Sequence, residues 1–167
     1  TAGDGSGTLV FDHVSFQYPD GEAPVLRDIT FEARRGDTIA FIGSTGSGKS
    51  TLINLIPRFY DISSGSIRID NVDVRRYDLK ALREKIGFIP QKALLFTGSI
   101  NENIRYGKHN AVQTEVEHSA KVAQAYDFIT EKPKQFEEMI EEGGGNVSGG
   151  QRQRLSIARA VVRKPDI

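Results

Sequence analysis

The eight residues Gly43-Ser44-Thr45-Gly46-Ser47-Gly48-Lys49-Ser50 decide how this chain folds. They match the pattern G-x-x-x-x-G-K-[ST], a loop that leaves a buried strand, enters a helix and surrounds phosphate groups. Glycine lacks the Cβ that would hold the backbone away from a phosphate, and the N-terminus of a helix adds partial positive charge. The octapeptide therefore predicts a phosphate-binding loop, with a plain Gly/Ser-rich surface loop as the alternative.

Two side chains of this loop indicate which ligand carries the phosphate groups. Lys49 supplies a compact cation for β- and γ-phosphates, and Ser50 offers a hydroxyl to Mg²⁺, a hard ion that prefers oxygen ligands. ATP and Mg²⁺ are therefore the predicted ligands.

The residues on either side of the loop fit the strand and helix that the motif requires. Thr38 to Ile42 form a short apolar run, typical of a strand buried on both faces of a sheet. Leu52 and Leu55 begin a helical spacing that Pro57 should end or kink. The centre of the chain is therefore predicted to be of the α/β class.

Before the phosphate loop, the pattern of the N-terminal part of the chain predicts β-strands. Apolar residues alternate along 9–16 and along 29–33, which predicts two half-buried antiparallel strands, with Tyr18-Pro19-Asp20-Gly21 as a turn between them. A second alternation surrounds an Asp70-Asn71 turn. Phe88-Ile89 predicts another buried strand after a helix at 79–86.

After Gln91 the pattern becomes helical. Ser99 is followed by Glu102 and Thr114 by Glu117, so each pair predicts a capping box at the start of a helix. A last helix is predicted from about Gly150 to Arg163, with Pro165 ending it.

Composition excludes several classes of function. The chain has 167 residues, and its 22 Lys and Arg balance its 22 Asp and Glu, so no net positive charge is available to hold a nucleic-acid backbone. It has no Cys, which excludes disulfides and thiol chemistry. No apolar run approaches the roughly 18 to 20 residues that span a bilayer.

A second motif, Ser148-Gly149-Gly150-Gln151, precedes the last predicted helix. Taken alone, a Ser before two Gly is also what a helix N-cap with a flexible entry looks like. Together with the phosphate loop it resembles the signature of the ATP-binding cassette (ABC) superfamily, Leu-Ser-Gly-Gly-Gln, with Val147 at the first place. The resemblance extends from about Leu9 to Ile167.

The resemblance implies a fold and a set of site residues. The fold is an α/β P-loop NTPase of the ABC ATPase type, with an antiparallel β subdomain and a helical subdomain. Tyr18 corresponds to the aromatic that stacks on adenine, although a lone Tyr beside a turn is also a common packing residue. Gln91 corresponds to the Q-loop glutamine that contacts Mg²⁺ and the attacking water, with a solvated loop residue as its alternative. The implied residues are, for catalysis, Gln91 and Lys49; for nucleotide, Tyr18, Gly43, Ser44, Thr45, Gly46, Ser47, Gly48, Lys49, Ser50, Thr51 and Gln91; for Mg²⁺, Ser50 and Gln91; and, acting on a second copy, Ser148, Gly149, Gly150 and Gln151.

The subtype that the chain resembles is the exporter branch, that of multidrug and lipid half-transporters. Four stretches carry this resemblance: Arg58-Phe59-Tyr60-Asp61, Leu82-Arg83, Leu95-Phe96 and Ser99-Ile100-Asn101-Glu102-Asn103-Ile104. Glu142-Gly143-Gly144-Gly145-Asn146 resembles the exporter X-loop, with a mobile glycine loop as its alternative. The implied partners are a second nucleotide-binding domain, identical or not, and a transmembrane permease domain fused on the N-terminal side, at the cytoplasmic face of a membrane.

We expect residues 1–7 to be a flexible linker or a remnant of cloning, and 8–167 to be a partial nucleotide-binding domain with its helical subdomain at about 97–163. In the family, the Walker B Asp-Glu pair and the switch histidine come after the sequence that ends here at Ile167. We therefore expect the C-terminal part of the core to be missing and the 167 residues alone to bind ATP without hydrolysing it. His13, His109 and His118 do not match the switch histidine, and no two have metal-ligand spacing with a carboxylate.

Two other interpretations compete with that of an exporter domain. A soluble ABC ATPase of chromosome maintenance requires a long coiled coil between Gln91 and Ser148, and that segment holds no sustained heptads. A non-catalytic nucleotide-binding fragment that acts through interaction differs from the exporter domain in whether a longer parent exists.

Overall fold

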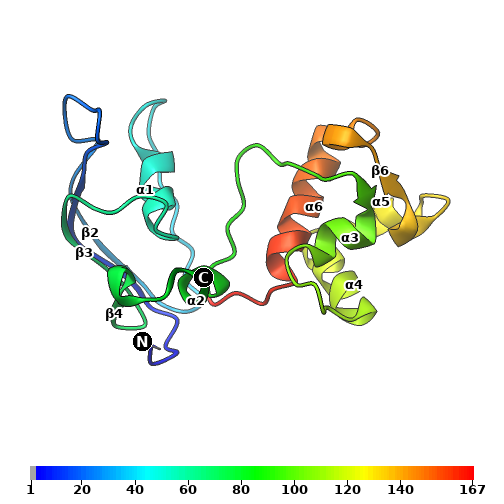
Figure 1. Ribbon diagram of the computed structural model, residues 1–167, viewed down its shortest axis with the longest axis horizontal. Helices are drawn as coiled ribbons and strands as arrows, with labels where there is room; N and C mark the ends of the chain where they lie inside the picture. The colour runs from blue at the N-terminus through cyan, green and yellow to red at the C-terminus, as the bar shows by residue number, and fades with distance from the viewer. Residues whose placement is uncertain (1–2) are drawn as a thin grey trace. The chain divides into compact units, whose positions relative to one another are not determined.

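A four-stranded antiparallel sheet forms the first part of the fold in the computed structural model, which describes residues 3–167 (Figure 1). The strands are β1 (Leu9–Phe16), β2 (Leu26–Ala33), β3 (Ser64–Ile69) and β4 (Val72–Asp73), in the order β2-β1-β3-β4. The alternation of apolar residues along β1 buries one of its faces, as predicted. The buried side chains of these strands are Leu9, Phe11, Val14, Phe16, Leu26, Ile67 and Ile69.

The turn between β3 and β4 is the one predicted at Asp70-Asn71. Both residues have positive φ, 49° and 61°, which suits a two-residue hairpin turn. The Asp70 carboxylate is buried and accepts hydrogen bonds from the Gly7 backbone N–H at 2.6 Å and from Lys85 Nζ at 2.8 Å. Burial alone would raise the pKa of Asp70, but the Lys85 ammonium and the Gly7 N–H lower it below its usual value.

These contacts correct the expectation that folding begins near Thr8. Asp4 accepts a hydrogen bond from the Asn71 side chain at 2.6 Å, so the chain is held against the hairpin turn from residue 4 onward. The correction arises because a short Gly- and Ser-rich segment can still supply backbone N–H groups to a buried carboxylate. The start of the expected linker, residues 1 and 2, lies outside the described residues.

Two helices accompany the sheet. Helix α1 (Lys49–Leu55) ends before Pro57, as predicted. Helix α2 (Leu79–Glu84) begins where the Asp78 side chain accepts hydrogen bonds from the N–H groups of Lys80 and Ala81. A single 3₁₀ turn, Val74–Arg76, joins β4 to α2.

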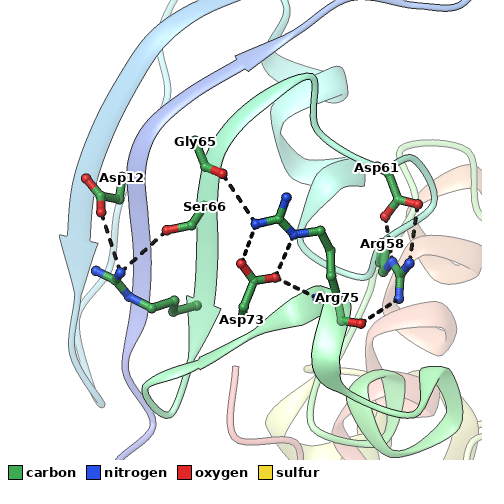
Figure 2. A network of polar contacts seen from close by, with 8 residues as sticks. Asp12, Arg58, Asp61, Gly65, Ser66, Asp73 and Arg75 are labelled. Carbon is green, nitrogen blue, oxygen red and sulfur yellow. Dashed lines mark hydrogen bonds and ion pairs between the residues drawn. The ribbon is translucent and has the colours of Figure 1, made fainter.

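An arginine network fixes the chain around this 3₁₀ turn (Figure 2). Arg75 forms an ion pair with Asp73 at 2.6 Å and reaches the carbonyl oxygen of Gly65 on β3. Arg58 pairs with Asp61 at 2.6 Å and donates to the carbonyl oxygen of Arg75. The Arg58 to Asp61 stretch that resembles the exporter branch therefore has a structural role: it ties the residues after α1 to the turn after β4.

Two predicted strands are wrong in the described part of the chain. Thr38–Ile42 and Phe88–Ile89 have no regular secondary structure, and Ile42 is 97% exposed. A strand needs a neighbouring strand to pair with, and neither segment belongs to a sheet formed by the described residues. The first segment is anchored through Phe41, whose ring meets Phe31 of β2 at 5.3 Å between centroids.

The chain divides into two units, one formed by the described residues up to Ile86 together with Asp166 and Ile167, and the other by Gly87–Pro165. The second unit contains α3 (Ile100–Arg105), α4 (Gln113–Val122), α5 (Tyr126–Thr130), α6 (Gly149–Val161) and a two-stranded sheet of β5 (Gly98–Ser99) and β6 (Met139–Ile140). Two 3₁₀ turns, Gln135–Glu137 and Glu142–Gly144, complete it. Its fully buried side chains include Ile100, Ile104, Val116, Ile129 and Leu155.

One of the two predicted capping boxes is confirmed. Ser99 and Glu102 cap α3 reciprocally, with Ser99 Oγ accepting from the Glu102 N–H at 3.1 Å. The Thr114 and Glu117 pair is wrong, because α4 begins at Gln113 and Glu115 instead accepts from the Val112 N–H at 3.2 Å. Glu115 is held in this role by Lys108 and Lys164.

None of the helices among residues 3–167 combines the length and the apolar character needed to cross a membrane.

Candidate nucleotide-binding site

The predicted phosphate loop is an exposed turn that ends at the first residue of α1. Gly48 precedes the helix with φ of 91°, in the left-handed region. A Cβ there would lie 2.9 Å from Cδ2 of Leu26 and 3.2 Å from Cγ1 of Val25. Glycine is therefore required at this position both by the backbone conformation and by the close approach of β2 and the residue before it.

Lys49 closes the loop on itself. Its Nζ donates hydrogen bonds to the carbonyl oxygens of Gly43 at 2.6 Å and Ser44 at 2.7 Å, and to Ser47 Oγ at 3.1 Å. A Cβ on Gly43 would lie 2.5 Å from Ser47 Oγ and 3.2 Å from Ser47 Cβ, so these two loop residues approach each other closely. The result is a narrow glycine-lined turn with a primary ammonium at its centre.

The loop fits the phosphate groups that the sequence predicts. Residues 43–47 and Ser50 are exposed, so a ligand can reach their backbone N–H groups and the Ser50 hydroxyl. Closely spaced N–H groups and a lysine form a concavity suited to an anion, and a loop hydroxyl suits Mg²⁺ held mainly by phosphate and water oxygens. Among residues 3–167, no group of three or more His, Cys, Asp or Glu side chains is placed to hold a metal ion.

Tyr18 lies next to this loop. It follows β1, begins the predicted turn, in which the Gly21 N–H donates to the Tyr18 carbonyl oxygen at 2.9 Å, and is half-buried. Its hydroxyl lies 2.9 Å from Oγ1 of Thr51 on α1. Its ring meets Phe16 and Tyr60 edge-on, at centroid distances of 4.8 Å and 5.2 Å. The structure therefore brings Tyr18 and the phosphate-loop helix together.

The predicted signature residues start α6 in the second unit. Ser148 is the N-cap, its Oγ accepting from the Gln151 N–H at 3.1 Å, while the Gln151 side chain accepts from the Ser148 N–H at 3.0 Å. The N-cap interpretation of this Ser is thus confirmed. Gly149 and Gly150 are exposed between them, and a Cβ on Gly150 would meet nothing within 4 Å.

Gln91 is exposed and also belongs to the second unit. Together with Gly149, Arg152 and Gln153 it lines an open hollow of about 370 Å³. The structure thus groups the predicted site residues in two sets. One set consists of Tyr18 and the phosphate loop on the first unit, and the other of Gln91 and the signature on the second.

The glycine-rich stretch before the signature is held by several hydrogen bonds. Asn146 donates to the Met139 carbonyl oxygen at 2.7 Å and accepts from the Glu141 N–H at 3.1 Å. Arg152 donates to the Gly144 and Val147 carbonyl oxygens, both at 3.1 Å. These bonds attach the X-loop-like segment to β6 and to the first turn of α6.

Sequence reasoning missed the aromatic and hydroxyl surroundings of Tyr18. The sequence indicates Tyr60 only as part of an exporter-like stretch, and Thr51 as a nucleotide-binding residue without its contact to Tyr18. The available signal was the position of Tyr60 shortly after a helix that Pro57 ends; its ring lies 5.7 Å from that of Phe16 on β1, between centroids.

Comparison with known proteins shows the family to which the chain belongs. Residues 26–167 match the family model described as ABC transporter, and the chain belongs to the ABC transporter family. It is 48% identical over 162 residues to YfiB of Bacillus subtilis, named as an uncharacterized ABC transporter ATP-binding protein. That alignment covers 97% of this chain and 28% of the relative. It is also 48% identical over 161 residues to a Staphylococcus aureus protein named provisionally as a multidrug export ATP-binding/permease protein, with 96% and 28% covered.

A solved structure extends the likeness to three dimensions. A bacterial Atm1-family ABC exporter with ATP bound matches with a TM-score of 0.91 and 36% identity, over 99% of this chain and 28% of that chain. The fold is therefore that of an ABC-type P-loop NTPase, with an antiparallel sheet and helices. The chain spans 28% of the length of these relatives.

Proposed function

We propose that this chain is the ATP-binding part of an ABC exporter, in which ATP binding and hydrolysis drive a substrate across a membrane. The observation that carries the proposal is the phosphate loop, closed by Lys49 on the Gly43 and Ser44 carbonyl oxygens and open to solvent along 43–47. The similarity to a structure described as an exporter with ATP bound supports the same proposal.

Each predicted site residue of the first unit would have its own part in nucleotide binding. The loop N–H groups and Lys49 would hold the β- and γ-phosphates, because fixed N–H dipoles and a cation complement their negative charge. Ser50 would present its hydroxyl to Mg²⁺, which when bound supplies charge neutralisation at the phosphates. Tyr18 would stack on the purine, and Thr51, directly after Ser50, would take part in the nucleotide site from the first turn of α1.

The second unit would complete a site on another copy. Ser148, Gly149, Gly150 and Gln151 would cover the nucleotide bound to a second nucleotide-binding domain, so that two sites form in a head-to-tail dimer. The exposure of Gly149 and Gly150 beside a helix N-terminus supports this part of the proposal, since nothing in their own unit covers them. Gln91 would contact Mg²⁺ and the attacking water.

We propose that ATP binding and hydrolysis drive a transmembrane permease domain fused on the N-terminal side, with the nucleotide-binding domain at the cytoplasmic face of the membrane. The name of the Staphylococcus aureus relative, which joins ATP-binding and permease, supports this part. That residues 1–167 alone bind nucleotide without hydrolysing it stays a prediction, to be tested by phosphate release from the isolated segment.

The test of nucleotide binding is Lys49→Ala. Removing a charge-assisted contact of roughly 1.5 to 3 kcal/mol should weaken MgATP binding about tenfold to a hundredfold. Isothermal calorimetry on the protein at its full natural length measures this, with Lys80→Ala on the exposed face of α2 as the matched control. Equal affinity of Lys49→Ala and the parent would refute the assignment of the phosphate loop.

A further inference from the structure

The hydroxyl of Tyr18 and the hydroxyl of Thr51 form a hydrogen bond of 2.9 Å between residues 33 positions apart in the sequence. Thr51 is 7% exposed and lies in the first turn of α1, directly after Ser50 of the phosphate loop. Tyr18 lies just beyond the end of β1. This bond therefore joins the loop after a strand to the helix that begins in the phosphate-binding turn.

This hydroxyl bond links the far end of the Tyr18 side chain to α1, whereas its ring contacts lie with Phe16 and Tyr60. Phe16 and Tyr60 meet its ring at interplanar angles of 82° and 87°, so neither is stacked parallel on it. Edge-on contacts limit tilting of the ring but are broad in energy and do not fix how far the ring stands from α1. A hydrogen bond at the para position does, because it constrains the far end of the side chain at 2.9 Å.

We propose that Thr51 is a positioning residue for Tyr18, whose ring it holds at a set distance from the phosphate loop. A nucleotide contacts both places at once, through its base and its phosphates, and binding is strongest when the two subsites already have the required separation. This inference rests on the proposed function, since it assumes that the loop at 43–51 binds nucleotide. Thr51 would thus affect nucleotide binding through the ring of Tyr18.

A different role for Thr51 makes the opposite prediction. If its hydroxyl contacts a phosphate directly, losing it should weaken every ligand that carries the phosphates, whether or not it carries a base. If it positions Tyr18, its loss should affect only ligands that have a base. Inorganic tripolyphosphate and a non-hydrolysable ATP analogue, both with Mg²⁺, separate the two cases.

The experiment compares Thr51→Val with Thr51→Ser by calorimetry on the protein at its full natural length. Valine keeps the shape of threonine and removes the hydroxyl, and serine keeps the hydroxyl. We expect Thr51→Val to weaken the ATP analogue roughly twofold to tenfold, the range for one hydrogen bond, and to leave tripolyphosphate unchanged. Thr51→Ser should restore analogue binding, and Thr38→Val, at an exposed site of the first unit, is the matched control.

Tyr18→Phe provides the independent check, because it removes the same hydrogen bond from the other side. It should match Thr51→Val in the ATP analogue, and the double variant should lose no more than either single one. Equal weakening of tripolyphosphate by Thr51→Val, or fully additive losses in the double variant, would overturn the inference while leaving the phosphate loop assigned. A parent protein that binds neither ligand would instead overturn the proposed function.

Discussion

Arg159 of α6 holds Asn103 of α3 twice: its Nε donates to the Asn103 carbonyl oxygen at 2.9 Å, and its Nη2 donates to Asn103 Oδ1 at 2.9 Å. A third bond runs from Arg159 Nη1 to the Leu94 carbonyl oxygen at 2.8 Å. The guanidinium also lies 4.9 Å from the centroid of the Phe96 ring. The helix that starts at the signature is thereby fastened to α3 and to the chain that leads into it.

Replacing Arg159 with Lys should destabilise the protein although the charge is kept. An ammonium is a point charge and cannot reach three acceptors in a plane, nor lie flat over an aromatic ring. Losing such bonds from a half-buried charged group costs about 2 to 3 kcal/mol. Urea unfolding followed by circular dichroism measures the free energy of unfolding.

The control for this prediction is Arg154→Lys on the same helix. Arg154 is exposed and donates one bond, to the Gln124 carbonyl oxygen at 3.2 Å. We expect its replacement to change the free energy of unfolding by less than about 0.5 kcal/mol. If both variants unfold at the same urea concentration, the three acceptors of Arg159 do not act as a structural clamp.

Gly48→Ala should weaken nucleotide binding through the shape of the phosphate loop. The alanine Cβ would meet Leu26 Cδ2 at 2.9 Å and would hold a strained φ of 91°, so the start of α1 has to shift. Strain of this kind costs about 1 to 3 kcal/mol, equivalent to roughly a fivefold to hundredfold loss if it appears in the bound state. Calorimetric titration with MgATP is the measurement.

Gly36→Ala separates the two causes. Gly36 has a similar φ of 89°, lies in an exposed turn and has nothing within 4 Å of an added Cβ. It should cost some stability from backbone strain and leave nucleotide affinity unchanged. A loss of affinity in Gly36→Ala as large as in Gly48→Ala would show that general destabilisation, rather than the contact with Leu26, weakens binding.

The sequence predicted those features that depend on neighbouring residues. The helix that begins within the octapeptide at 43–50, the alternation along β1 and the capping pair of Ser99 and Glu102 each depend on a few neighbouring residues, and the structure confirms all three. The capping box predicted for Thr114 and Glu117 did not form, and the reason is also local. A glutamate at the third helical position can accept from the N-cap N–H whatever the N-cap side chain is, so Val112 served in place of a Ser or Thr.

The contacts that organise the candidate site depend on distant residues, and no local pattern announces them. Tyr18 and Thr51 are 33 positions apart, and Arg159 and Leu94 are 65 apart. The strand predicted at 38–42 shows the same limit, because apolar residues suit a buried strand but pairing depends on a neighbouring strand elsewhere in the chain. The sequence therefore predicted the turn that leads into α1 but not the contacts that hold Tyr18 beside it.

The stability of the second unit should fall in acid because of Glu115. Hydrogen bonds from Lys164 and Lys108, with the Val112 N–H, lower the pKa of Glu115 from 4.5 to about 2. A carboxylate with a lowered folded-state pKa stabilises the fold fully above its unfolded-state pKa and loses that contribution as the pH falls through the folded value. The contribution should therefore be complete above pH 4.5 and disappear toward pH 2.

Glu115→Gln tests this pH dependence by urea unfolding at pH 6 and at pH 3. The variant should be less stable than the parent at pH 6, and the difference should shrink at pH 3 and in high salt, which screens the lysine charges. Glu117→Gln, on the same helix, should follow the parent at both pH values. A difference between Glu115→Gln and the parent that is the same at pH 6 and pH 3 would rule out the titration of Glu115 as its cause.

Tyr18→Ala should weaken ATP and GTP binding alike. An aromatic ring stacks on the flat face of any base and does not read the hydrogen-bonding edge that distinguishes adenine from guanine. Base stacking of this kind contributes roughly 1 to 3 kcal/mol, so each affinity should fall about fivefold to a hundredfold. Titration of both nucleotides with the parent and with Tyr18→Ala gives the two ratios. Tyr18→Phe keeps the ring and loses only the hydroxyl bond to Thr51, so it should weaken both nucleotides by roughly twofold to tenfold, less than Tyr18→Ala does. If Tyr18→Ala loses GTP binding and keeps ATP binding, the site reads the edges of the base instead. If neither affinity changes, Tyr18 is a packing residue of the cluster that it forms with Phe16 and Tyr60.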